Sequence, residues 1–372
     1  MKKLIILGNG FDLHSNLKSS FNDFFVASEV NAVEKWLNSE RKTDNLKEVS
    51  FVSLLLYNSY YRKDLKYEDF ELRVHDVHFN ETFQKAFELE KNMVDWMDIE
   101  NFLYSILNSN GLSKLVRCFD HCFAKRYPDL KFCFCDFDGI PAFINVCLNG
   151  KGYFSVSDFY SFFMEELKLF EKRFICYLKT QLDSNEKYVD ESKKILETFC
   201  KNDSGVILNF NYTHTNKNDN YEEINVHGSL EDRIIIGIDD RDSLKNEVIP
   251  FTKTFRKLLF SEEKVLLNGT YDEIIIYGHS LNEQDYSYFK SIFDYINLYN
   301  GKTTIRYIYS DDFVSEDVFN KNRYKHRTKM AMRLFKLIRT YGSSLDNKDS
   351  GQNLIHKLIL EGRLKLELNN FE

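Results

Sequence analysis

Proline and long apolar runs are scarce in this sequence. Of its 372 residues only 3 are proline while 43% are hydrophobic, a balance that excludes a disordered chain and predicts a large core in more than one domain. No apolar run is long enough to span a bilayer. The run after Met1 is broken by Gly8 and no small-residue cleavage site follows, so we expect no signal peptide, no membrane contact and a cytoplasmic location.

A disulfide framework is also missing, because the chain has seven cysteines, an odd number. Two interpretations of residues 118–135 are open: buried free thiols among Phe132 and Phe134, or a zinc site in which His121 joins four cysteines. The C-x3-C and C-x-C spacings depart from the usual zinc knuckles, so we predict no metal. The cysteines are Cys118, Cys122, Cys133, Cys135, Cys147, Cys176 and Cys200.

The chain carries little excess positive charge except in one segment. Its net charge of −7 and pI of about 5.8 argue against nucleic-acid binding by the whole molecule. Between Val318 and Leu345, however, there are eight Lys or Arg and no Asp or Glu. Because apolar residues recur there at helical spacing, one interpretation is a solvated helix face. The other is a surface for a protein partner or for nucleic acid, bound between Lys321 and Arg339.

Residues 4–12, Leu-Ile-Ile-Leu-Gly-Asn-Gly-Phe-Asp, predict a strand and a tight turn, followed within residues 15–25 by a helix or by a loop that enters one. Gly8 and Gly10 let the backbone turn without Cβ clashes, so that peptide N–H groups can face a nucleotide phosphate. In the alternative interpretation Gly-x-Gly only closes the turn, because the third glycine of the dinucleotide-binding fingerprint is absent.

Helical periodicity dominates from about residue 27 to 201, and short apolar strands begin at Gly205. This pattern predicts an α/β fold with a parallel sheet that the first strand joins. We expect a Rossmann-like nucleotide-binding domain of residues 1–40 and 204–345, a large, mostly helical insertion of residues 41–203 and a C-terminal helical tail of residues 346–372. The predicted strands are 206–210, 223–226, 233–238, 273–277 and 303–309; the predicted helices are 49–61, 81–96, 99–107, 112–127, 156–182, 186–200 and 284–299.

Polar residues follow the predicted strands. In a doubly wound sheet, ligands bind beyond the carboxyl ends of the strands, so these residues are candidates for a site. In chain order they are Asp12, Asn211, Thr213, His227, Asp239, Asp240, His279 and Ser280.

The same motifs, in this order, resemble the bacterial abortive-infection AbiH family. They are Gly8-Asn9-Gly10-Phe11-Asp12-Leu13, Ser20-Phe21-x-Asp23-Phe24, Trp96-x-Asp98-x-Glu100, Asn209-Phe210-Asn211-Tyr212-Thr213, Val226-His227-Gly228 and Tyr277-Gly278-His279-Ser280-Leu281-x-x-x-Asp285. AbiH-like proteins are in turn similar to the sirtuin-like NAD-binding fold. That resemblance implies that NAD is surrounded by Gly8, Gly10, Asn211, His227, Gly278 and Ser280. We add Asn9 and Phe11 to the nucleotide-binding set, and Asp12 or Asp285 to bind a ribose hydroxyl.

Cleavage of the nicotinamide–ribose bond passes through a cationic ribosyl transition state, so it needs a base and a polar group that orients water. His227 can supply the base because histidine titrates near neutral pH. Asn211 can orient water and the ribose. We therefore expect an antiphage effector that hydrolyses NAD and stays silent until infection. Thr213 stands where the sirtuin-like aspartate would be, so protein deacylation is not expected.

Two other functions stay open. A nuclease or nucleic-acid-directed toxin would use the basic segment and Mg²⁺, which Asp98, Glu100, Asp239 and Asp240 could hold. A nucleotide sensor would do no chemistry and would act through a partner. Each candidate residue also has a purely structural interpretation, in which His227 bonds a strand end, Asn211 fixes a turn and Asp12 caps the following helix. His279 and His214 are weaker candidates for the site, because neither matches the sirtuin-like pattern and exposed loop histidines are common. The expected partners are NAD or a related nucleotide, a phage-derived activator, a second copy of the chain and nucleic acid.

Overall fold

The structure is a computed structural model that describes residues 1–37, 49–57, 99–108, 156–200, 203–215, 220–240, 244–260, 267–310 and 319–369. The chain separates into two compact units. The first unit comprises Met1–Ser19, Lys179–Ile235 and Lys257–Glu372. The second comprises Ser20–Leu178 and Ile236–Arg256.

The first unit is built on a six-stranded sheet in the order β3-β2-β1-β4-β5-β6. Every neighbouring pair of strands is parallel. This is the strand order of the doubly wound α/β fold, whose order reverses between the first strand and the fourth. The predicted parallel sheet is therefore confirmed. Its strands are β1 (Lys2–Leu7), β2 (Ser204–Asn209), β3 (Tyr221–Asn225), β4 (Glu273–Tyr277), β5 (Thr304–Tyr309) and β6 (Leu364–Leu368).

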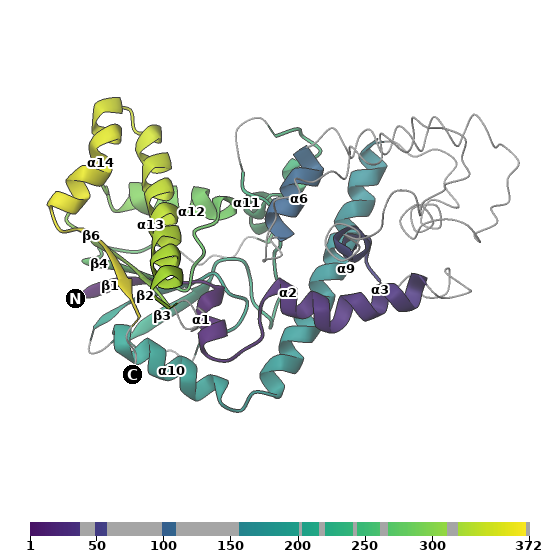
Figure 1. Cartoon of the computed structure of the whole chain (residues 1–372). Helices are drawn as coiled ribbons and strands as arrows, with labels where there is room; N and C mark the ends of the chain where they lie inside the picture. Colours follow the sequence, from purple (N-terminus) through teal and green to yellow (C-terminus); the bar gives the residue numbers. More distant parts are fainter. Residues whose placement is uncertain are drawn as a thin grey trace, which may run out of the picture. The chain divides into compact units, whose positions relative to one another are not determined.

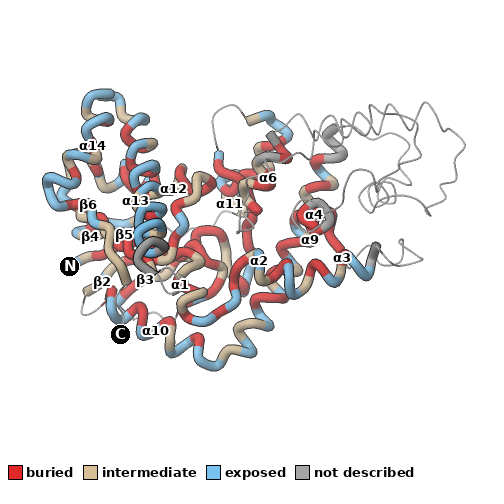
Figure 2. Tube along the Cα trace, viewed as in Figure 1, coloured by how far each residue is buried: buried red, intermediate tan, exposed pale blue. Residues whose placement is uncertain are grey.

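The central strands are apolar on both faces, because helices cover both. Leu4 and Ile6 of β1 point into one core cluster, and Ile5 and Leu7 point into another. The first cluster contains side chains from α12 (Tyr286–Tyr295), α13 (Phe319–Ser344) and α14 (Lys348–Leu360); the second contains side chains from α1 (Asn9–His14) and α10 (Tyr188–Cys200). Figure 1 shows α13 and α14 beside each other on one face of the sheet and α10 along the other. In Figure 2 buried and exposed residues alternate along α10 and α13, as expected for helices that cover a sheet.

The turns that follow β1 and β4 are packed backbone against backbone. The Gly8 N–H donates to the Tyr277 carbonyl at 3.0 Å. The Gly10 N–H donates to the Gly278 carbonyl at 2.8 Å. A Cβ on Gly8 would lie 2.4 Å from the Cα of His279, and a Cβ on Gly10 would lie 2.7 Å from the Cα of Gly278. Glycine is therefore needed here because the two turns touch.

The second unit is mostly helical within its described residues. Its aromatic core includes the edge-to-face pair of Phe24 and Phe170 and the contact of Phe163 with Phe251. A buried ion pair lies beside it: Arg256 Nη2 donates to Glu171 Oε2 at 2.8 Å, and burial raises the pKa of the Glu171 carboxyl. The elements are α2 (Phe21–Phe24), the π-helical η1 (Phe25–Glu29), α3 (Val30–Leu37), α4 (Phe51–Leu56), α6 (Ile99–Asn108), most of α9 (Val156–Asp183), η6 (Ile249–Phe251) and the start of α11 (Lys253–Leu258).

Most of the predicted elements that fall on described residues are confirmed. The strands at 206–210, 223–226, 273–277 and 303–309 correspond to β2, β3, β4 and β5, and the helices at 99–107, 156–182 and 186–200 to α6, α9 and α10. The helix at 284–299 is shorter, because α12 ends at Tyr295 after the short η7 (Glu283–Asp285). The predicted helices 81–96 and 112–127 lie outside the described residues, and α4 covers part of the helix at 49–61.

One local prediction was wrong, and one short helix was not predicted. The segment 233–238 forms only isolated bridges, because its N–H groups go to unrelated partners: Ile235 donates to the His227 carbonyl, whereas Ile238 donates to the Phe251 carbonyl. The helix that was not predicted is α1, whereas the expected loop that enters a helix within residues 15–25 is confirmed. Gly8 alone makes the turn, in extended backbone, and α1 begins at Asn9. Residues 15–20 form a loop, and α2 starts after Ser20, whose hydroxyl accepts from the Asp23 N–H in a capping box.

The units differ from the domains expected from the sequence. Residues 20–40, assigned above to the nucleotide-binding domain, belong to the second unit, and residues 179–203 belong to the first. The helical tail of residues 346–372 includes α14 but also β6, which completes the sheet beside β5. Leu364 and Leu366 of β6 pack against the first core cluster, so this end of the chain is part of the fold.

The contact between the two turns can be tested with a matched pair of substitutions. Gly278 and Gly362 both have φ +66°, so alanine meets the same backbone strain of about 1–2 kcal/mol at either place. A Cβ on Gly278 would lie 2.3 Å from the Phe11 nitrogen, whereas nothing lies within 4 Å at Gly362. We expect Gly278→Ala to lower the free energy of unfolding by about 1–3 kcal/mol more than Gly362→Ala, measured by urea denaturation. Equal losses would contradict the tight contact.

Candidate functional site

The strand register brings the predicted site residues to one edge of the sheet. Leu7 of β1 is paired with Asn209 of β2 and with Tyr277 of β4, and Asn209 is paired with Asn225 of β3. Four strands therefore end in one row. The residues that follow them lie at the carboxyl edge, beside the point where the strand order reverses, which is where doubly wound sheets bind ligands.

Two histidines at this edge share one carboxylate. His227 Nε2 lies 3.1 Å from Asp285 Oδ1, and His279 Nε2 lies 3.5 Å from Asp285 Oδ2. All three residues are buried. Asp285 occupies the N-cap position of α12 but makes no capping hydrogen bond. Its carboxylate instead faces the two imidazoles, so it is placed to hold their rings.

Aromatic rings enclose the histidines. The Phe210 ring packs at right angles to both imidazoles, with centroid distances of 5.2 Å to His227 and 4.7 Å to His279. Tyr288 packs edge-to-face on His227, and Phe289 does so on His279. Because apolar rings exclude water, the charge–dipole interactions of the Asp285 carboxylate are stronger here than they would be at the surface.

The backbone fixes the tautomer of His279. The Leu281 N–H donates to His279 Nδ1 at 2.9 Å, so that nitrogen carries a lone pair. In the neutral ring the proton is then on Nε2, which faces Asp285. Leu281 has φ +51°, a left-handed conformation that is uncommon for a residue with a branched side chain. Backbone strain of this kind is often found beside functional groups.

Asparagine side chains fix the loop that carries Asn211. The Asn211 N–H donates to Asn209 Oδ1 at 3.0 Å, and Asn211 Nδ2 donates to the Gly8 carbonyl at 3.1 Å. Asn225 Nδ2 donates to the carbonyls of Asn211 and Thr213, at 2.9 Å each. The ends of β1, β2 and β3 are thus joined through side chains, which holds Asn211 in one orientation.

Asp12 lies behind this loop, fully enclosed. Its Oδ1 accepts from the Tyr188 hydroxyl at 2.8 Å, and its Oδ2 accepts from the Thr213 hydroxyl at 2.9 Å. Burial raises the pKa of the Asp12 carboxyl to about 7, although both hydroxyls oppose that shift. The Asp12 carboxylate, one of the two expected to bind a ribose hydroxyl, thus accepts from the hydroxyls of Tyr188 and Thr213 instead. Through these bonds Asp12 links α1 to the loop after β2 and to α10.

The glycine turn has most of its donors engaged. The Gly8 N–H donates to the last residue of β4 and the Gly10 N–H to the turn after β4, and the Phe11 N–H donates to the Gly8 carbonyl at 2.8 Å. The Phe11 side chain is fully buried in the second core cluster. Asn9 Oδ1 accepts from the Ser19 hydroxyl at 2.6 Å. Asn9 and Gly10 are partly exposed, so a nucleotide would meet this turn through them.

The structure brings His227, Asn211, Gly8, Gly278 and Asp285 together, and leaves Ser280 exposed beside them. The residue that sequence reasoning undervalued is His279. The signal was present, since His227 and His279 each stand two residues after the last residue of a strand. His214, by contrast, is half-exposed and pairs with Glu231 at 3.0 Å.

Among the described residues, the groups considered for metal binding do not form a metal site. Glu100 forms an ion pair with Lys253 at 2.7 Å, while Asp98 and the cysteines from Cys118 to Cys147 lie outside the described residues. Neither Cys176 nor Cys200 forms a disulfide. Within the described parts of the chain, no three His, Cys, Asp or Glu side chains are arranged to hold a metal ion. None of the helices described is both long and apolar enough to cross a membrane.

These features define an α/β protein with a parallel sheet and a polar, aromatic-lined cluster at its carboxyl edge. Residues 4–307 match the protein family described as bacteriophage abortive infection AbiH. Because the match covers most of the sequence, the chain belongs to this family, which indicates a role in abortive infection of phage-infected cells. No curated protein and no solved structure matches the chain significantly.

The burial of Asp12 predicts a pH dependence of stability. Its pKa is about 7 in the folded chain and 3.8 in the reference state, so between these values the folded chain keeps a proton that the unfolded chain has lost. Stability from this group therefore falls as the pH rises from about 4 to 7, by at most about 1.4 kcal/mol per pH unit. Asp12→Asn, which does not titrate, should flatten the curve of unfolding free energy against pH over this window.

Urea titrations at pH 5, 6, 7 and 8 measure the difference between the wild type and Asp12→Asn. Other buried acids titrate equally in both chains, so they cancel in that difference. Parallel curves would show that Asp12 is ionised in the folded chain and contradict the raised pKa.

Proposed function

We propose that this chain is an abortive-infection effector that hydrolyses NAD at the nicotinamide–ribose bond. The observation that carries the proposal is the pairing of His227 with Asp285 at 3.1 Å, at the carboxyl edge of a sheet with the doubly wound strand order. A sirtuin-like arrangement of NAD across Gly8, Asn9, Gly10, Gly278 and Ser280 is part of the same proposal.

In the proposed reaction, water attacks the C1′ carbon of the ribose. The C1′–N bond breaks, its electron pair stays on the nitrogen and neutralises the pyridinium, and ADP-ribose and nicotinamide are formed. His227 accepts the proton that the water gives up. Asn211 orients the water, and its link to the Gly8 carbonyl keeps its amide next to the glycine turn.

Asp285 acts in this proposal as a positioning residue. A carboxylate that accepts from one imidazole nitrogen fixes the ring and stabilises the imidazolium that forms when the ring takes a proton. The oxygens of Asp285 face His227 and His279, so this role fits its geometry better than a direct bond to a ribose hydroxyl.

Burial of the site supports a silent resting form. His227 is 4% exposed and Asn211 is 5% exposed, so NAD can reach them only after the covering side chains move. Tyr288, which is partly exposed and packs on His227, is the nearest candidate for such a movement. A phage-derived activator would act by opening this cover, which would explain how a cell tolerates the protein before infection.

The first test is the NAD content of cells that express the wild type, His227→Ala or Asn211→Ala, before and after phage challenge. We expect NAD to fall after challenge with the wild type, and both variants to slow the loss by about 10²–10⁴-fold. His214→Ala is the matched control, since His214 is half-exposed and outside the cluster, and should behave like the wild type.

Soluble expression and thermal unfolding of each variant exclude misfolding as the cause. Constant NAD during effective phage protection by the wild type would refute the hydrolysis. A non-catalytic nucleotide sensor would be supported instead if His227→Ala also kept full protection.

A second prediction separates positioning from binding. Asp285→Asn keeps the size of the side chain but removes its charge, so a positioning role predicts a fall in kcat of at least about 10²-fold with little change in KM, measured with activated protein and NAD. If Asp285 instead bound the ribose directly, KM would rise while kcat stayed nearly constant.

A further inference from the structure

Helix α13 has a charge opposite to that of the whole chain. The chain carries a net charge of −7, yet this helix contains no Asp or Glu. Its inner side is buried by Met330, Leu334, Leu337, Ile338 and Tyr341, so its place on the sheet is fixed by the core. The backbone positions that carry the outer cations are therefore fixed relative to one another.

The outer side combines two kinds of side chain. Lys325, Lys329 and Lys336 are exposed at spacings of four and seven residues, which places them on one side of the helix. Tyr324 and Phe335 are also exposed, 11 residues or about 16 Å apart along the axis, on the adjacent strip of the surface. A row of cations thus runs beside a row of aromatic rings.

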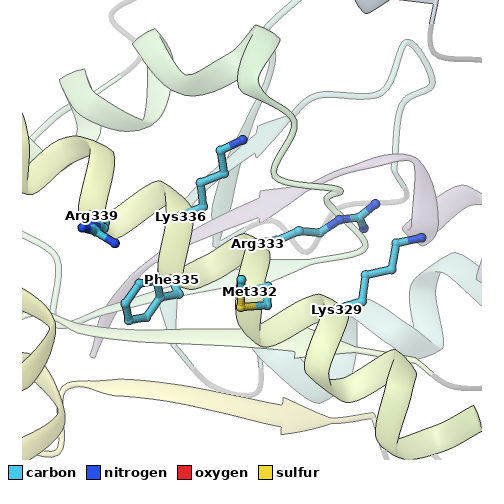
Figure 3. A pocket seen from close by; sticks show the side chains of 6 residues that line it. All are labelled: Lys329, Met332, Arg333, Phe335, Lys336 and Arg339. Atoms are coloured by element: carbon cyan, nitrogen blue, oxygen red, sulfur yellow. The ribbon is translucent and has the colours of Figure 1, made fainter. Parts of the chain in front are cut away.

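The apolar side chains here are unusually open. Tyr324 is 75% exposed, Met332 is 62% exposed and Phe335 is 45% exposed. A surface groove of about 500 Å³ is lined by Lys329, Met332, Arg333, Phe335, Lys336 and Arg339 (Figure 3). Apolar groups that are left in water beside such a groove, and rimmed by charge, are typical of an interaction surface.

Few of these cations are neutralised. Lys336 lies against the Glu283 carboxylate. Among the described residues, no carboxylate oxygen lies within ion-pair distance of Lys325, Lys329 or Arg339. Since the family match ends at residue 307, α13 also lies beyond the region that the AbiH description covers.

We propose that the outer face of α13 binds single-stranded nucleic acid without reading its sequence. The cations match a line of phosphates, and the flat rings of Tyr324 and Phe335 match unpaired bases, which stack on aromatic side chains in proteins of this kind. An acidic polypeptide could form ion pairs with the cations, but it has no bases to stack on the rings of Tyr324 and Phe335. A duplex hides its bases, so it would leave the rings exposed.

The test is fluorescence anisotropy of the full chain with a labelled 20-nucleotide dT strand, a rU strand of equal length and a dT·dA duplex. We expect both single strands to bind more tightly than the duplex. With about four phosphate contacts, a rise from 50 to 200 mM NaCl should weaken the binding of the single strands by roughly 50-fold.

Two variants separate the contributions. Lys325→Gln with Lys329→Gln should make the slope of log affinity against log salt shallower by about 1.4. Tyr324→Ala with Phe335→Ala should weaken binding by at least about fivefold without changing that slope. Lys193→Gln with Lys194→Gln, which removes two exposed cations of α10, is the matched control and should bind like the wild type. All substitutions are on exposed positions, and circular dichroism confirms folding.

Several results would overturn the proposal. The first is that neither single strand binds at 50 mM NaCl. The second is that the single strands bind but neither α13 variant weakens that binding, and the third is that the duplex binds more tightly than the single strands. Binding of polyglutamate or of vesicles with 30% phosphatidylserine, without binding of the strands, would assign the face to another anionic partner. The result is independent of NAD hydrolysis, because no residue of the histidine cluster is altered.

Discussion

The close contact between the turns after β1 and β4 is the constraint on which the site depends. Gly8 and Gly10 have no room for a Cβ because the backbone of Gly278 and His279 occupies that space. This contact sets the direction in which the chain leaves β4, and so brings His279 and Leu281 to their positions around Asp285. Gly8 and Gly10, which suggested a phosphate-binding turn, thus allow the turns after β1 and β4 to pack against each other. Any nucleotide would therefore bind to a turn that is already rigid.

The carboxyl edge of the sheet combines a polar interior with very little exposure. Asp12, Asn209, Asn211, His227 and Asp285 are all buried, and each has hydrogen-bond or ion-pair partners within the chain. Such a network holds its members in one geometry, because breaking any bond leaves a buried polar group unsatisfied. The same burial keeps ligands out. In this conformation, the burial that fixes these side chains also blocks a ligand from reaching them. A ligand could contact them only after a covering side chain, such as that of Tyr288, had moved.

The sequence predicts the sheet well because its strands are short apolar runs with polar residues at their ends. β4 matches its predicted bounds, and the polar residues after β1, β2, β3 and β4 do gather at one edge. Periodicity cannot show which partner a side chain selects. The pairing of His227 with Asp285, the enclosure of Asp12 by Tyr188 and the burial of Phe11 arise from residues far apart in the sequence. The failure at 233–238 has the same origin, since its isoleucines are buried but their N–H groups bond to separate segments.

The place of β1 in the sheet has a consequence for synthesis of the chain. Its Leu7 pairs with Asn209 and Tyr277, so the first strand to leave the ribosome has no sheet partner until 202 further residues have been made. At the usual speed of translation this takes about 10–40 s. An apolar strand that stays unpaired for so long is exposed to aggregation, and its pairing closes a very long loop. We therefore expect cotranslational folding to start in the second, mostly helical unit, while chaperones protect β1 until β2 emerges from the ribosome.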